Sequence, residues 1–237
     1  MNKYLRHIYI LFFLSSISIV HLKAQLYESG IHIGYNLSQF KLKENKLSDE
    51  ILVREGNRYS GGTVGIQFKM SPPKDQNVSF FKIIPSILFE GSLCRCGGNI
   101  ELTTTFPDGS KSFNKLTYVL YRSSYSLKFV ANMKNFRFLI GPTFSNNFYS
   151  AVQVGINEKF KYAGDQFALF SVGYEFGIGQ RVGRFLFSAR YDGLISDFGR
   201  ETTLFPTKYR YRQYKFMIHY FLFQKHKGAN WGSIYGR

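Results

Sequence analysis

Cysteine, helical periodicity and acidic residues are all scarce in this chain of 237 residues. The two cysteines, Cys94 and Cys96, stand one residue apart, which excludes a scaffold built on disulfides. Leu and Ala do not dominate, and no long stretch repeats its apolar residues with a helical period, so a helical bundle is not favoured. Lys and Arg number 31 against 15 Asp and Glu, which gives a formal charge of +16.

The first 24 residues form a segment of their own. Lys3 and Arg6 precede a short apolar run over residues 8–20, and Ala24 offers a small residue before Gln25. This order predicts a cleaved secretory signal peptide over residues 1–24, since the run is short for a bilayer-spanning helix. A signal anchor is the alternative. No cysteine follows the run, so a lipid-anchored N-terminus is not expected.

The exported chain remains basic. Loss of Lys3, Arg6 and Lys23 lowers the formal charge from +16 to +13. No nucleic-acid motif appears, so we expect no nucleic-acid partner. Export favours anionic lipid, lipopolysaccharide or polysaccharide as the partner of a basic protein.

What the chain has in abundance is aromatic residues and glycine: 25 Phe, 17 Tyr and 22 Gly, which favour strands and tight turns. Residues 167–194 show the pattern most clearly, as two strands joined by a glycine-rich turn. Phe170, Tyr174 and Phe187 lie on one face, and Glu175 and Arg190 lie on the other. One face of this hairpin is aromatic and the other is charged.

The same alternation over the rest of the chain predicts eight strands. They cover residues 31–38, 63–70, 81–90, 116–129, 136–147, 168–178, 185–192 and 209–223. Pro85 lacks a backbone N–H and indicates a bulge in the third strand. The connections alternate long and short: residues 40–59, 92–115, 149–166 and 196–208 are predicted as long loops. An even strand number with this alternation is typical of transmembrane β-barrels.

The fold class predicted is therefore all-β, an eight-stranded antiparallel transmembrane β-barrel over residues 25–223, followed by a polar periplasmic tail over residues 224–237. A soluble lipocalin-like barrel is the alternative and would turn the apolar faces inward. The apolar faces carry too many rings for a narrow interior. An Arg or Lys facing lipid near the midplane would cost about 2–4 kcal/mol, so we expect the charges in the lumen and no open pore.

The polar faces supply a predicted lumen charge network, with Lys69, Lys82 and Lys128 on the same faces. Its members are Glu90, Arg122, Arg137, Glu175, Arg190, Asp192 and Lys215. Glu175 and Arg190 lie on neighbouring strands, as either a proton relay or a structural ion pair. The ion pair is favoured, because an acidic residue in a basic interior needs partners.

Two further sets of residues suggest chemistry only weakly. His32 and His219 lie on the first and last strands, which closure makes adjacent, and a metal site or catalytic base there is conceivable. No Cys or carboxylate is expected at their level, so no metal, catalytic residue or cofactor is predicted. Cys94 and Cys96 are expected in an external loop, with no defined role.

The start of the last strand is rich in tyrosine and arginine. Tyrosine suits the membrane interface, and arginine can pair with lipid phosphates. This favours a rim that anchors the barrel at the membrane interface, with a lipopolysaccharide-contacting rim as the alternative. Its residues are Tyr209, Arg210, Tyr211, Arg212 and Tyr214.

Three segments then suggest a family. VGYEFGIG (residues 172–179), FLFSARYDGLISDF (185–198) and the closing YFLF (220–223), together with FLIGPTF (138–144), resemble the outer-membrane β-barrel domain of PorT-like proteins of the Bacteroidota. The resemblance spans about residues 26–223. It departs from the family pattern at YVLYRSSYSLKF (118–129), where Arg122 and serines replace an acidic residue and proline. It implies an integral outer-membrane barrel; one branch of the family is tied to secretion and gliding machinery.

For function, the sequence leaves three hypotheses open. The first is a non-enzymatic barrel that binds an envelope or secretion partner through its external loops or periplasmic tail. The second is a small channel or transport component. The third is a lipid-modifying enzyme at the rim, for which no Ser/His/acid spacing is found.

Overall fold

The structure is a computed structural model that describes residues 26–42, 50–71, 84–133, 135–155, 158–163, 166–196 and 209–226. Ten strands lie in this part of the chain: β1 (Leu26–Leu42), β2 (Ile51–Glu55), β3 (Tyr59–Ser71), β4 (Ile84–Thr105), β5 (Lys111–Met133), β6 (Phe136–Val154), β7 (Lys161–Tyr162), β8 (Phe170–Val182), β9 (Phe185–Leu194) and β10 (Tyr209–His226). Among the described residues, no helix is long and apolar enough to cross a membrane.

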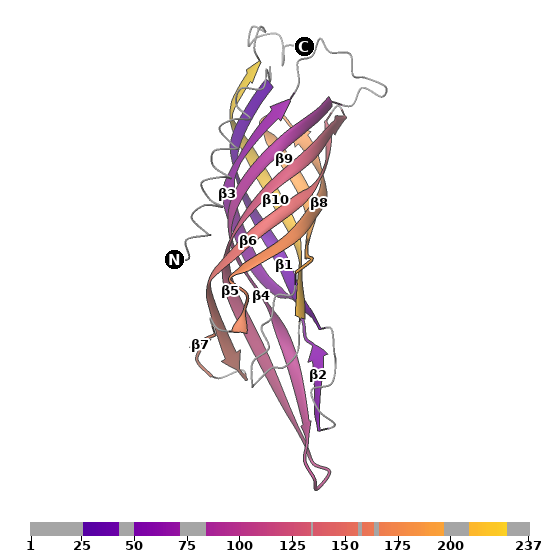
Figure 1. Cartoon of the computed structure of the whole chain (residues 1–237). Coiled ribbons are helices and arrows are strands. Elements are labelled where there is room, and N and C mark those ends of the chain that lie inside the picture. Colours follow the sequence, from indigo (N-terminus) through magenta and orange to yellow (C-terminus); the bar gives the residue numbers. More distant parts are fainter. Residues whose placement is uncertain are drawn as a thin grey trace.

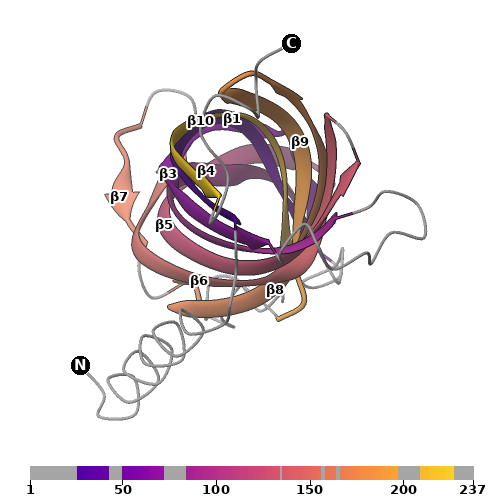
Figure 2. The ribbon, with the colours of Figure 1, turned by 90° about the horizontal axis from the view of Figure 1, so that it is seen from above.

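Eight of these strands close into an antiparallel barrel. Each of β1, β3, β4, β5, β6, β8, β9 and β10 pairs with its neighbours in that order, and β10 pairs back onto β1. The closing ladder runs from Leu26 opposite His226 to Leu42 opposite Tyr209. Figure 1 shows the tilted strands, and Figure 2 shows the closed ring along the axis. The predicted eight-stranded antiparallel barrel is confirmed.

The two faces of the barrel wall are opposite in character. Along β8, Val172, Tyr174 and Phe176 point outward and are exposed, whereas Ser171 and Glu175 point inward and are buried. The same alternation continues around the ring, so exposed Ile, Val, Phe and Tyr side chains cover the outer wall. An apolar surface of this extent is not stable in water, and it suits a bilayer. The barrel is therefore of the transmembrane type, and the soluble alternative is excluded.

The predicted loop over residues 92–115 is wrong. β4 continues to Thr105 and β5 begins at Lys111, so most of this segment is a hairpin that projects beyond the barrel (Figure 1). The hairpin turns at Pro107-Asp108-Gly109, with Gly109 at φ 80° and Ser110 N donating to Asp108 Oδ1 at 2.9 Å. These hydrogen bonds from Ser110 lower the pKa of the exposed Asp108 carboxyl. Glycine, cysteine and threonine replace large apolar residues along this hairpin, so its alternation is weak in the sequence.

Other boundaries shift in the same direction. β2 lies in the predicted loop 40–59 and pairs with β4, while β7 lies in the predicted loop 149–166 and pairs with β6. Pro85 causes no bulge: β4 and β5 keep one register there, and β3 pairs with β4 only from Ile87 onward. β10 reaches His226, three residues into the expected tail. The predicted signal peptide, Lys82 and residues 197–208 and 227–237 lie outside the described residues.

Candidate functional site

The lumen is filled by buried charged side chains. All seven residues of the predicted charge network point inward and are at most 6% exposed. The inward side chains of eight strands meet across a narrow space, which leaves little room between them. Small residues on the same faces make this possible: a Cβ added at Gly177 would lie 2.7 Å from Arg190 Cγ.

Arg190 on β9 is the centre of the network. Its Nη1 donates to Glu90 Oε1 and Oε2 at 2.9 and 2.7 Å, and to Glu175 Oε1 at 2.9 Å. Glu90 lies on β4, across the ring from β9 in the strand order, so this contact spans the lumen. The predicted contact between Glu175 and Arg190 is present as a diagonal pair on neighbouring strands, β8 and β9.

Two lysines complete the central cluster. Lys128 on β5 pairs with Glu175 and, at 3.3 Å, with Glu90. Lys215 on β10 contacts Glu175 at 2.8 Å and Asp192 at 2.9 Å. Three carboxylates, Glu90, Glu175 and Asp192, thus meet three cations, Lys128, Arg190 and Lys215. The cluster is electrically balanced, which is the condition for burying charges at tolerable cost.

Arg122 adds a further buried cation next to this cluster. Its guanidinium lies 4.6 Å from the ring centroid of Tyr211, and it donates to Ser171 Oγ at 3.5 Å. Contact with an aromatic face and a hydroxyl group replaces part of the hydration that the guanidinium loses on burial.

A second ion-pair layer crosses the lumen at the end where β1 begins. Glu28 on β1 accepts contacts from Lys69 at 2.9 Å and from Arg137 and Arg181 at 2.7 Å each. Both guanidinium groups also lie over the Phe221 ring, at 4.9 and 4.8 Å. The sequence analysis missed Glu28, because it began the first strand at Ile31. The signal was present, since Glu28 shares the parity of His32.

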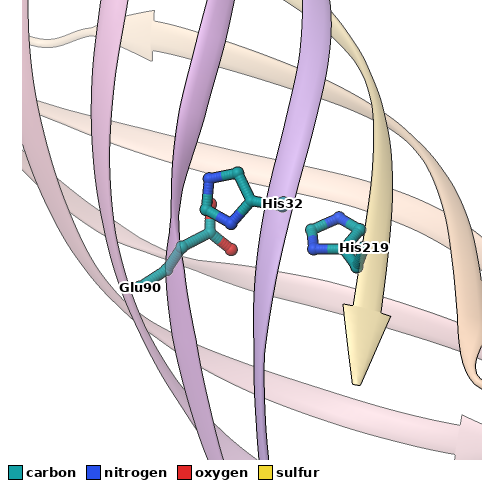
Figure 3. A group of neighbouring side chains, drawn as sticks. All are labelled: His32, Glu90 and His219. Carbon is teal, nitrogen blue, oxygen red and sulfur yellow. The ribbon is translucent and has the colours of Figure 1, made fainter. Parts of the chain in front are cut away.

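His32 and His219 are opposite each other on β1 and β10, with ring centroids 5.2 Å apart, and both are buried. The expectation that no carboxylate shares their level is wrong: Glu90 Oε1 lies 3.8 Å from His32 Nε2 (Figure 3). Ser92 is the β4 residue at the level of His32, and Glu90 lies two residues away from it along the strand, opposite Gln67. The long side chain of Glu90 reaches back to His32, which the strand pattern alone cannot reveal.

These three side chains could in principle hold a metal, because their ligand atoms lie within 4.8 Å of one another. The guanidinium of Arg190, however, already occupies the position that a metal ion would take between these ligand atoms. Its Nη2 lies 2.9 Å from His219 Nε2 while its Nη1 binds Glu90. A divalent ion would have to displace this guanidinium and add charge to a balanced cluster, so the residues do not fit a metal centre.

The opposite end of the lumen is closed by apolar side chains. Phe40 and Phe167 stack on each other, and Tyr118 meets both rings edge-on, with ring centroids 5.3–5.8 Å apart. Cys94 and Cys96 belong to this buried cluster and are free thiols, so the expectation of an external loop for them is wrong. They alternate with Arg95 along β4 and therefore point inward. Cys94 Sγ accepts hydrogen bonds from Asn36 at 3.3 Å and Gln213 at 3.1 Å.

The predicted lipopolysaccharide-contacting rim divides between the two faces. Tyr211 is 1% exposed and points into the lumen, so its assignment to the rim is wrong; Arg210 and Tyr214 share the outward parity of β10. Arg212 has the same parity and contacts Gln39 at 3.0 Å and Glu55 at 3.7 Å. The side chain of Tyr209 lies outside the described part of the structure. The strand alternates, so a run of rim residues cannot all face lipid.

Comparison with known proteins gives no family. No family model matches the chain, and no curated protein matches it. Among solved structures, the chain is similar to Ail, the attachment invasion locus protein of Yersinia pestis, in complex with the heparin analogue sucrose octasulfate, with 12% identity, a TM-score of 0.41 and coverage of 82% of this chain and 97% of that chain. It is also similar to Neisserial surface protein A (NspA), with 10% identity, a TM-score of 0.43 and coverage of 83% and 97%.

Proposed function

We propose that this chain is an integral outer-membrane protein, not an enzyme, that binds an envelope or secretion partner through the β4–β5 hairpin. One observation carries the proposal: the lumen is crossed by two ion-pair layers and capped by an apolar cluster, while the hairpin projects beyond the barrel. Because the lumen is filled, a partner can bind only to the outer surface or to the segments beyond the barrel. The β4–β5 hairpin is the largest described segment that lies beyond the closed ring of strands.

The outer membrane is the membrane that accommodates such a barrel. A closed antiparallel sheet satisfies every backbone hydrogen bond within the bilayer, and bacterial single-chain barrels with even strand numbers occupy the outer membrane. The basic and apolar segment before residue 25 supplies the export signal. The first residues of β1 and the last residues of β10 then lie on the periplasmic side, and the β4–β5 hairpin lies on the external side.

The hairpin has the properties of a binding element. Beyond Cys94, β4 no longer pairs with β3, and residues 100–104 pair with β2 instead. The part of β5 over residues 111–114 pairs with β4 but not with β6, which leaves one backbone edge open among the described strands. Phe113 on this edge is 75% exposed. An open strand edge with an exposed aromatic side chain favours a protein partner.

The channel and the rim enzyme are weaker candidates. Arg190, Glu90 and Glu175 join opposite walls of the lumen, so ion flow would require breaking buried ion pairs. His32 and His219, the histidines whose side chains are described, lie in the lumen and not at the rim. The resemblance to PorT-like proteins remains a prediction, and a place in secretion machinery is part of this proposal.

Photo-crosslinking in native outer membranes tests the proposal. A photoreactive residue at position 113 should capture a specific protein, whereas the same residue at Arg184, in the turn between β8 and β9, should not capture it. Planar bilayers containing the purified protein should show no single-channel conductance. Reproducible conductance, or recovery of the protein without detergent in the soluble periplasm, would overturn the proposal.

A further inference from the structure

The outer wall over β1 and β10 changes from apolar to basic within a few residues. Going toward the hairpin end, the outward cross-strand pairs are Ile33–Ile218, Tyr35–Phe216, Leu37–Tyr214, Gln39–Arg212 and Lys41–Arg210. The first two pairs are apolar, Tyr214 stands at the boundary, and the last two pairs carry cations. Tyrosine at such a boundary is typical of the membrane interface. The wall therefore leaves the membrane at this level.

Lys41 and Arg210 are directly opposite each other, and both are exposed. Like charges in opposed positions repel and destabilise a strand pair. Neither residue forms an ion pair with a carboxylate among the described residues. An anion bound between them would remove the repulsion.

Two more arginines lie on aromatic rings of the same wall, at the level of Leu37 and Ser38. The guanidinium of Arg58 lies 5.1 Å from the ring centroid of Tyr214, and that of Arg95 lies 5.9 Å from the ring centroid of Tyr59. The rings hold the planar guanidinium groups along the wall. Within the described residues, neither guanidinium has a salt bridge. Together with Arg212, these four residues form the outer-wall basic patch: Lys41, Arg58, Arg95, Arg210 and Arg212.

The patch is strongly unbalanced. Glu55, 3.7 Å from Arg212, is the one described carboxylate that forms an ion pair with any of its five cations. The interior of the barrel shows the contrast, since its central cluster matches three cations with three carboxylates. Five cations with one carboxylate partner among the described residues favour an anionic ligand from outside the chain.

An apolar groove next to the patch identifies the class of ligand. The groove has a volume of about 840 Å³ and runs across the outer wall over β3, β1, β10, β9 and β8. Gly62, which is opposite Tyr35, leaves open space at its floor, and Tyr35 and Phe216 are one outward pair away from Tyr214. A small polar anion would gain nothing from an apolar groove, because it has no apolar part to bury there. A lipid places its acyl chains there and its headgroup at the cations.

We infer that the outer-wall basic patch binds the phosphate groups of a phosphorylated glycolipid of the outer leaflet, with the acyl chains in the adjacent groove. The inference rests on the proposed function in one respect: it takes the barrel to lie in the outer membrane with the hairpin end outside. Arg58 and Arg95 donate to phosphate oxygens at the level of the Tyr214 and Tyr59 rings, and Lys41 and Arg210 supply positive charge further toward the hairpin end. Bidentate donation by arginine suits the oxygens of a phosphate group.

Lipid binding by the purified full-length mature chain in a zwitterionic detergent tests the inference, with lipid A as the probe and native mass spectrometry as the readout. The unmodified protein should retain phosphorylated lipid A in preference to enzymatically dephosphorylated lipid A. The double variant Arg58→Gln/Arg95→Gln should weaken binding of the phosphorylated lipid by about thirtyfold, since two basic contacts are lost. Lys41→Gln/Arg210→Gln should weaken it as well while leaving thermal stability unchanged or raised. Arg184→Gln, which removes an exposed arginine at the opposite end of the barrel, is the matched control and should bind as the unmodified chain does.

Equal retention of both lipids, or unchanged binding by both double variants, would overturn the inference. Complete competition by millimolar inorganic phosphate would also overturn it, because the site would then recognise free phosphate and not a lipid. The proposed function is judged separately, by crosslinking and conductance. The lipid measurement uses purified protein, so a failure of one proposal does not imply failure of the other.

Discussion

Arg190 and Glu90 stand 100 residues apart in the chain, yet one nitrogen of the guanidinium lies within 2.9 Å of both oxygens of the carboxylate. The contact joins β9 to β4 across the lumen, and neither strand pairs with the other. Ion pairs of this kind fix the distance between opposite walls of the barrel, and their side chains fill the lumen between those walls. The barrel is held from within as well as along its hydrogen-bonded ladders.

Replacing Arg190 tests this role. Arg190→Met keeps an unbranched side chain as far as the position of Nε and removes the rest of the guanidinium with its charge, so Glu90 and Glu175 lose a shared buried cation. We expect the free energy of unfolding to fall by about 3–5 kcal/mol, the usual cost of breaking a buried pair. Urea unfolding in lipid vesicles, followed by circular dichroism, measures the change.

Arg184→Met is the matched control for this substitution, because Arg184 is exposed in the turn between β8 and β9. Its stability should stay within about 0.5 kcal/mol of the unmodified chain. The double variant Arg190→Met/Glu90→Gln should recover part of the loss. Equal stability of Arg190→Met and Arg184→Met would show that the network does not support the barrel.

Gly177 provides a second test of lumen packing. A Cβ at this position would lie 2.7 Å from the Ala189 carbonyl oxygen and 2.7 Å from Arg190 Cγ. Gly177→Ala should therefore destabilise the barrel by about 1–3 kcal/mol through overpacking. At Gly62 the nearest atom to an added Cβ is 3.8 Å away, so Gly62→Ala should cost little. The same unfolding measurement compares the two, and a Gly177→Ala variant as stable as Gly62→Ala contradicts the prediction.

Period-two alternation was sufficient to predict the barrel, because each strand has one lipid face and one lumen face. Phe170, Tyr174, Glu175 and Arg190 all lie on the face that the sequence indicates. The alternation fails where neither environment applies. Beyond Cys94 the hairpin leaves the membrane, so its outer face no longer needs large apolar residues and reads as a loop.

The composition of the ion-pair clusters was predictable only in part. Alternation places Glu90, Arg190 and Lys215 in the lumen, but it does not say which of them meet. That depends on the stagger between strands and on the reach of long side chains, as the contact of Glu90 with His32 shows. Lys41, Arg58 and Arg95 were missed as a group for a related reason. The sequence analysis assigned all three to loops, and only the pairing of β1 with β10 and of β3 with β4 brings them onto one wall.

The lipid face of the barrel can be tested by a charge. Ile140 lies on the outer wall of β6, 59% exposed, between Phe129 and Phe176 in the ladder. Ile140→Arg should destabilise the folded barrel in vesicles by about 2–4 kcal/mol, because the cation faces hydrocarbon. Phe113→Arg changes an aromatic residue that is more exposed but lies on the hairpin, so its cost should be below about 0.5 kcal/mol. Similar costs at the two positions would contradict the assignment of the bilayer to the barrel wall.

Thiol labelling tests the inward direction of Cys94 and Cys96. Both lie under the apolar cluster that contains Phe40 and Tyr118, so a bulky maleimide should leave them unmodified in the folded barrel and modify both after unfolding in urea. Arg95 lies between them and is exposed on the outer wall. In a background of Cys94→Ser and Cys96→Ser, Arg95→Cys should be labelled in the folded state. The loop originally predicted for this segment would give rapid labelling at all three positions. Mass shifts measured before and after unfolding distinguish the two outcomes, since only a strand with alternating faces protects positions 94 and 96 while it exposes position 95.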